Sequence, residues 1–96
     1  MHIYEVIKRP IVTEKSNILE DLYGQYTFEV DRRANKLQIK EAVEQIFDVD
    51  VEKVRTVNMK PKRGRYGRRT VVREPAWKKA IVTLAPGQRI EVFEGV

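Results

Sequence analysis

One segment of this chain is unsuited to a buried core, and its position constrains how the rest can fold. Residues 60–73 read KPKRGRYGRRTVVR, with seven basic residues, no acidic ones and two glycines. The sequence on both flanks resembles β-strand. Because Lys and Arg are rarely buried unless they are paired, we expect this segment to be an exposed connection between two strands. The core must then come from the other residues.

The positive charge of the chain is local. The chain contains 19 Lys+Arg and 14 Asp+Glu, so that without these seven cations twelve basic residues face fourteen acidic ones, a remainder of about −2. Lys and Arg that neutralise phosphates release condensed counterions and gain affinity by doing so. A cationic segment on a nearly neutral body therefore predicts a surface for a polyanion, with nucleic acid as the leading candidate.

Length and composition restrict the class of protein. Ninety-six residues suit one domain, residues 1–96, of which we expect 60–76 to form an extended basic loop. There is no Cys, and His2 is the only histidine, so the sequence predicts no metal site and no cofactor. No run approaches the roughly 18 apolar residues of a membrane span. We expect a soluble cytoplasmic protein without membrane insertion, homo-oligomer formation or enzymatic activity.

Apolar periodicity predicts the secondary structure. Two helices are expected at about Thr13–Tyr23 and Lys36–Phe47, the second introduced by a capping box of Asn35 and Gln38. The expected extended segments are Ile3–Ile7 (an edge strand or a lead-in stopped by Lys8-Arg9-Pro10), Gln25–Val30, Val49–Met59, Trp77–Leu84 and a brief final strand within Arg89–Phe93.

Finer details follow from individual residues. Residues 25–30 alternate, which predicts a half-buried strand with Tyr26, Phe28 and Val30 on one face and Thr27 on the other. The apolar parity of the next strand changes between residues 51 and 54, as at a β-bulge or a change of the exposed face. Residues 85–88 read Ala-Pro-Gly-Gln, which places Pro and Gly where a type II turn requires them.

This order of elements predicts an α+β fold. We expect a two-layer sandwich in which an antiparallel sheet of three to four strands carries two helices on one face. The basic segment would connect two strands as a hairpin loop. It is much longer than the usual ~2–5 residues of such loops, and long loops in compact domains are often functional.

The basic loop combines three properties that suit RNA. Arginine offers a planar fork for phosphate oxygens, Tyr66 a ring on which a base could stack, and Gly64 and Gly67 permit close approach of the backbone. Without a ligand we expect the loop to be mobile, because like charges repel and little apolar surface fixes it. The candidate RNA-binding residues of the loop are Lys60, Lys62, Arg63, Arg65, Tyr66, Arg68, Arg69 and Arg73.

Four sequence blocks resemble a known family, bacterial large-subunit ribosomal protein twenty-three. They occur in the family's order and spacing over nearly the whole chain, around the basic loop. The blocks are RPIVTEK (9–15), KLQIKEAVE (36–44), FDVDV (47–51) and WKKA (77–80).

The resemblance implies a structural protein of the large subunit that binds its rRNA at the exit of the nascent-peptide tunnel, beside ribosomal protein twenty-nine. It also implies a docking surface for trigger factor and the signal recognition particle, with Glu14 as the docking residue. The rRNA-binding residues that it adds to those of the loop are Lys36, Lys40, Trp77, Lys78 and Lys79.

Each of these assignments has a simpler interpretation. Glu14 suits the first turn of a helix, where negative charge is favourable, and Lys36 and Lys40 suit a solvated helix face. Trp77 could be a core residue, because large aromatic side chains usually bury area. The rival to an RNA-binding protein is an interaction module whose basic loop grips an acidic partner or an anionic membrane surface.

Overall fold

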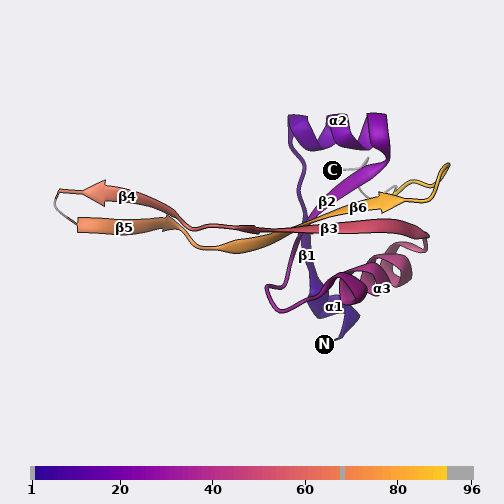
Figure 1. Cartoon of the computed structure of the whole chain (residues 1–96), viewed down its shortest axis with the longest axis horizontal. Coiled ribbons are helices and arrows are strands. Elements are labelled where there is room, and N and C mark those ends of the chain that lie inside the picture. Colours follow the sequence, from indigo (N-terminus) through magenta and orange to yellow (C-terminus); the bar gives the residue numbers. More distant parts are fainter. Residues whose placement is uncertain (1, 68, 91–96) are drawn as a thin grey trace.

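The computed structural model describes residues 2–67 and 69–90. Figure 1 shows the three helices and six strands of these residues, labelled in chain order. The bounds are α1 Ile3–Val6, β1 Ile7–Pro10, α2 Glu14–Tyr23, β2 Gln25–Val30, α3 Lys36–Phe47, β3 Val51–Met59, β4 Lys62–Tyr66, β5 Arg69–Glu74 and β6 Trp77–Leu84. No helix within the described ranges is long and apolar enough to cross a membrane.

The body of the protein is an antiparallel four-stranded sheet in the order β1-β2-β6-β3. This confirms the predicted α+β class and the antiparallel sheet. The register of β3 against β6 shifts between Val51 and Lys53, at the place where the change of apolar parity predicts a bulge. The turn after β6 also follows the prediction, because Gln88 N donates to Ala85 O at 3.2 Å and Gly87 has a φ of 83°.

The main core lies between the sheet and α3. Phe28, Ile39, Val43 and Val82 are fully buried there, and the rings of Phe28 and Phe47 stack with their centroids 5.6 Å apart. The predicted capping box fixes the start of α3, since Gln38 N donates to Asn35 Oδ1 at 2.8 Å and Asn35 N donates to Gln38 Oε1 at 3.0 Å. The strongest apolar pattern of the sequence thus forms the centre of the fold.

The position of α2 differs from the expectation of two helices on one face. Figure 1 shows α2 and α3 on opposite sides of the sheet. Ser16 and Leu19 of α2 line a groove with Thr27 and Ile81, whereas Phe28 and Val82, one position further along their strands, belong to the main core. Successive side chains of a strand point to opposite faces, so α2 covers the second face.

The central strands explain this difference. Residues 80, 81 and 82 of β6 are all buried, and Thr27 of β2 is 4% exposed although its alternation predicted a solvent-facing position. A strand in the middle of a sheet with helices on both faces has no solvent-facing side. The exposed Ile18 and Leu22 show that α2 nevertheless buries little of its own apolar stripe.

The N-terminal run also differs from its prediction. Residues 3–6 form the short helix α1, whose first turn is closed by Tyr4 N donating to His2 Nδ1 at 3.3 Å. The edge strand begins at Ile7 and includes the Lys8-Arg9-Pro10 sequence that was expected to end it. Pro10 is tolerated because β1 is an edge strand and Pro10 is its last residue.

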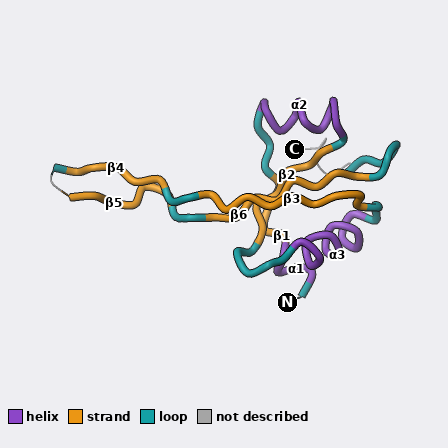
Figure 2. The backbone as a smooth tube through the Cα atoms, viewed as in Figure 1, coloured by secondary structure: helices purple, strands orange, loops and turns teal. Residues whose placement is uncertain are grey.

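The basic segment is built as a second, two-stranded sheet. β4 pairs antiparallel with β5 from Lys62↔Glu74 to Tyr66↔Arg69, and the ribbon projects from the body as a continuation of β3 and β6 (Figures 1 and 2). Gly67 begins the connection between them with a φ of 62°, a left-handed conformation that glycine adopts without strain. We call residues 60–76 the basic arm.

Two sequence predictions in these regions have separate outcomes. The backbone of the basic arm is paired where the sequence led us to expect an irregular loop. The final strand expected within Arg89–Phe93 falls mostly outside the described residues, and Arg89 and Ile90 are not in a strand.

Candidate nucleic-acid interface

The basic arm carries most of the predicted RNA-binding residues away from the body. Lys60, Lys62 and Arg63 have exposed side chains near its root. The structure places Arg65, Tyr66, Arg69 and Arg73 only through the pairing of their backbones, and Arg68 lies outside the described residues.

The three residues that follow the arm point to two faces of the sheet. Trp77 pairs with Met59 at the start of β6 and is half-buried. Lys79 lines the groove beneath α2 together with Trp77. Lys78 points to the other face, where its Nζ donates to the Ala34 carbonyl at 2.5 Å. Lys78 is therefore bonded to the body, which makes it a weaker candidate for RNA contact than Lys79.

The remaining predicted residues lie on the helices. Lys36 and Lys40 are exposed and four residues apart on α3, a spacing that places them on the same helix face. Glu14 is the exposed first residue of α2. Thr13 caps the helix: its Oγ1 accepts from Ser16 N at 3.1 Å, and its backbone N donates to Ser16 Oγ at 2.7 Å. This capping box keeps the Glu14 carboxylate at the solvent-facing end of α2.

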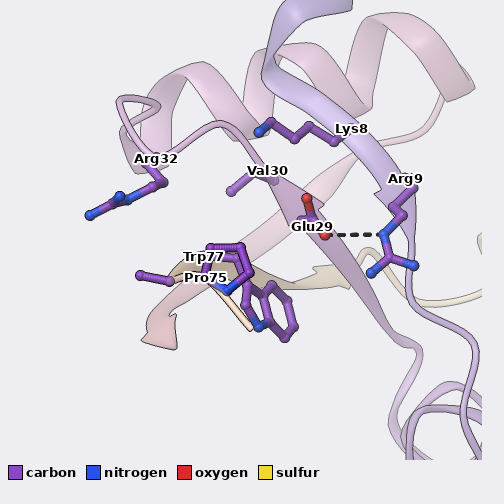
Figure 3. A pocket seen from close by; sticks show the side chains of 8 residues that line it. Lys8, Arg9, Glu29, Val30, Arg32, Pro75 and Trp77 are labelled. Carbon is purple, nitrogen blue, oxygen red and sulfur yellow. Dashed lines mark hydrogen bonds and ion pairs between the residues drawn. The ribbon is translucent and has the colours of Figure 1, made fainter. Parts of the chain in front are cut away.

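A groove at the root of the basic arm contains cations that the sequence did not single out. It has a volume of about 400 Å³ and lies where the end of β2 and the edge strand β1 meet the start of β6. Figure 3 shows Lys8 and Arg9 on β1 across the groove from Trp77, with the Arg32 side chain extending outward from the other end of the groove. A cationic groove with an aromatic wall is a common way to bind single-stranded nucleic acid.

The acidic residues beside the groove are already paired. Arg9 Nε donates to Glu29 Oε1 at 3.0 Å, as Figure 3 shows. Asp31 accepts from the Arg33 guanidinium at 3.2 and 3.3 Å and from Arg33 N at 2.8 Å. These bonds lower the pKa of Asp31 and raise the pKa of Arg33. Each carboxylate thus forms its hydrogen bonds with an arginine, and Lys8 and Arg32 have no ion pair with either of them.

One signal in the sequence could have located this groove. Lys8-Arg9 and Arg32-Arg33 are two dibasic pairs, of which the first lies within β1 and the second follows β2. The pairing Ile7↔Val30 brings the two ends together. We instead interpreted Lys8-Arg9-Pro10 as the stop of a strand, so the register that joins the pairs was not anticipated.

Comparisons with known proteins agree with the predicted resemblance. The family model described as Ribosomal protein L23 matches residues 5–92. A large ribosomal subunit protein uL23 from Desulfatibacillum aliphaticivorans is 51% identical over 96 residues, which cover all of both chains. The uL23 protein of Caldicellulosiruptor saccharolyticus is 58% identical over 93 residues, 96% of this chain and 95% of its own. That of Geobacter sulfurreducens is 50% identical over 98% of this chain.

The match extends through the body and the basic arm alike. It confirms the family that the four sequence blocks indicated, and because this is a structural family of the ribosome, it also confirms that the chain is no enzyme. With a full-length match at about half identity, the chain belongs to the ribosomal protein L23 family.

Proposed function

We propose that this protein is a structural component of the large ribosomal subunit in the bacterial cytoplasm, and that it binds large-subunit rRNA through the basic arm. The observation that carries the proposal is the arm itself, a cationic two-stranded ribbon that projects from a folded body in a ribosomal protein family. An isolated ribbon of this kind has no core of its own. Phosphates that neutralise its cations supply the interactions that the body does not.

The second part of the proposal concerns position and partners. The family resemblance supports a place at the exit of the nascent-peptide tunnel beside ribosomal protein twenty-nine. It also supports a role in docking trigger factor and the signal recognition particle. Glu14 is suited to docking because it is exposed at a capped helix start, where a partner's cation can reach it without disturbing the core. The exposed Ile18 and Leu22 on the same helix add apolar area for a partner.

The main test reverses the charge of the arm. A variant with four substitutions should lose about a hundredfold or more in affinity for large-subunit rRNA fragments near 0.1 M salt. The slope of log affinity against log salt should become less steep by about 3, because each lost phosphate contact removes about 0.7–0.9 from its magnitude. The substitutions are Arg63→Glu, Arg65→Glu, Arg68→Glu and Arg69→Glu.

The control uses the same hairpin. Arg63→Glu with Arg65→Glu in the arm is compared with Lys53→Glu and Arg55→Glu, which reverse two exposed charges of β3 in the body. Equal loss of rRNA affinity in both double variants would show that only net charge matters and would contradict a specific role of the arm. A protein that copurifies without rRNA and sediments away from ribosomes would favour the rival interaction module.

The docking role is tested separately. Glu14→Ala should leave incorporation into ribosomes unchanged and weaken trigger factor binding to those ribosomes about tenfold, the typical effect of losing one charged hydrogen-bond partner. Glu41→Ala serves as the control, since Glu41 is an exposed carboxylate on α3, across the sheet from α2. Equal binding of trigger factor to wild-type and Glu14→Ala ribosomes would exclude Glu14 from the docking surface.

A further inference from the structure

We infer that the groove at the root of the basic arm binds one unpaired nucleotide of RNA, with its base on the Trp77 ring and a flanking phosphate between Lys8 and Arg32. The inference rests on the proposed function and adds a second, structured contact to the electrostatic contact of the arm. The cations and the aromatic wall of the groove belong to the body, because Lys8 lies in β1, Arg32 follows β2 and Trp77 begins β6. Pro75 and Ala76, the last residues of the arm, complete its lining.

The charge of the groove selects an anion. Glu29 and Asp31 are each bonded to one arginine, Arg9 and Arg33 respectively. That pairing leaves Lys8 and Arg32 as surplus cations, and neither has an ion-pair partner in the described part of the chain. The pKa of Asp31 is lowered chiefly by Arg33 and least by Lys8, so Lys8 lies near Asp31 without being bonded to it. Both surplus cations can turn to a phosphate.

The apolar walls of the groove favour a ligand that carries an aromatic base as well as a phosphate. Val30, Pro75, Ala76 and the Trp77 indole give the groove apolar surface beside its cations, and its volume of about 400 Å³ exceeds the space that one inorganic anion fills. Nucleobases stack on indole rings irrespective of sequence, because every base has a π-face. A base within a duplex has both faces covered by its neighbours. The groove therefore suits an unpaired nucleotide.

The chain has its own probe for this contact. Trp77 is the only tryptophan, so the indole emission of the full-length protein reports on the surroundings of this one ring, which also lines the groove beneath α2. Single-stranded hexauridylate and hexaadenylate should quench or shift this emission to saturation. A blunt RNA duplex of equal charge should bind the arm and leave the emission nearly unchanged. Polyglutamate tests an acidic peptide as the ligand, and emission changes equal to those with RNA would overturn the assignment to a nucleotide.

Matched single variants locate the phosphate contact. Arg32→Gln should weaken binding of the hexanucleotides about tenfold, the usual effect of one charged hydrogen bond. Lys53→Gln removes the same charge at the opposite end of the sheet, where Lys53 pairs with Thr83, and should change the affinity by less than about twofold. Equal weakening by the two variants would overturn the phosphate site.

The stacking contact is tested with labelled RNA, since its variants alter the fluorophore. By anisotropy of the labelled hexanucleotide, Trp77→Leu should weaken binding about tenfold and Trp77→Phe by clearly less, because phenylalanine keeps an aromatic face. Equal losses in the two variants would contradict stacking. If the protein binds rRNA fragments with a steep salt slope while the indole emission stays constant, the groove is excluded and the proposed function stands. If rRNA fragments do not bind, the proposed function itself fails.

Discussion

The strand pair β3–β6 of the body and the strand pair β4–β5 of the arm form one long hairpin, but different interactions stabilise its two halves. In the body, β6 lies between β2 and β3, and its Ala80 and Val82 are fully buried under α3. In the arm, β4 and β5 have only each other. A free two-stranded ribbon is marginally stable in water at best. The comparison teaches that burial determines the fold of the body, whereas the arm has no core of its own, and under the proposed function its rRNA partner supplies the missing stabilisation.

The largest expected effect is a loss of stability when a core residue of the body is truncated. Phe28→Ala should lower the free energy of unfolding by about 3–5 kcal/mol, because Phe28 is fully buried and its loss leaves a cavity against α3 and Phe47. Urea denaturation followed by circular dichroism measures this change. The controls are Leu37→Ala on the exposed face of α3 and Arg63→Ala in the arm, each expected within about 0.5 kcal/mol of wild type. An arm variant as destabilising as Phe28→Ala would mean that the arm is part of the folding unit.

Amide hydrogen exchange tests whether the arm is less stable than the body. In the free protein, backbone amides of β4 and β5 should exchange with solvent at least about a hundredfold faster than those of Ala80 and Val82, since local opening of the arm exposes no core. Binding of a large-subunit rRNA fragment should slow exchange in the arm and leave the core amides unchanged. Arm amides that exchange as slowly as the core in the free protein, or as rapidly with rRNA as without it, would contradict the dependence on a partner.

Local signals in the sequence predicted the elements that the main core contains. The capping residue Asn35 marks the start of α3, and the apolar patterns of β2 and β6 mark these strands. In each case tertiary packing favours the same secondary structure as the local sequence does. The bulge in β3 was predictable because a change of apolar parity leaves a visible trace. Whether α2 lies above or below the sheet was not predictable, because α2 has a weak stripe and the buried Thr27 is polar.

The candidate site also has one part that the sequence predicted and one part that it did not. The arm was visible in the sequence because its seven cations are contiguous, a property of composition that needs no fold. The groove required tertiary structure, since Lys8, Arg32 and Trp77 come from three separate strand ends that the sheet brings together. The bond from Lys78 to Ala34 was equally hidden, because it links β6 with the segment before α3. Charge can be counted in a sequence, whereas its pairing depends on register.

The smallest expected effect concerns an exposed ion pair that belongs to neither half of the hairpin. The pKa of Asp31 is lowered below 3.8 by its bonds to Arg33, so the stabilisation is present above the unfolded pKa and is lost as pH falls through the folded one. Asp31→Asn, which keeps an acceptor for Arg33 N, should lower the urea midpoint slightly at about pH 6 and by less at about pH 2, where a larger fraction of the carboxyl is protonated. Arg33→Gln should abolish the same pH-dependent difference. If Asp31→Asn lowers the midpoint equally at both pH values, the loss of stability comes from the turn and the charge of the pair contributes nothing.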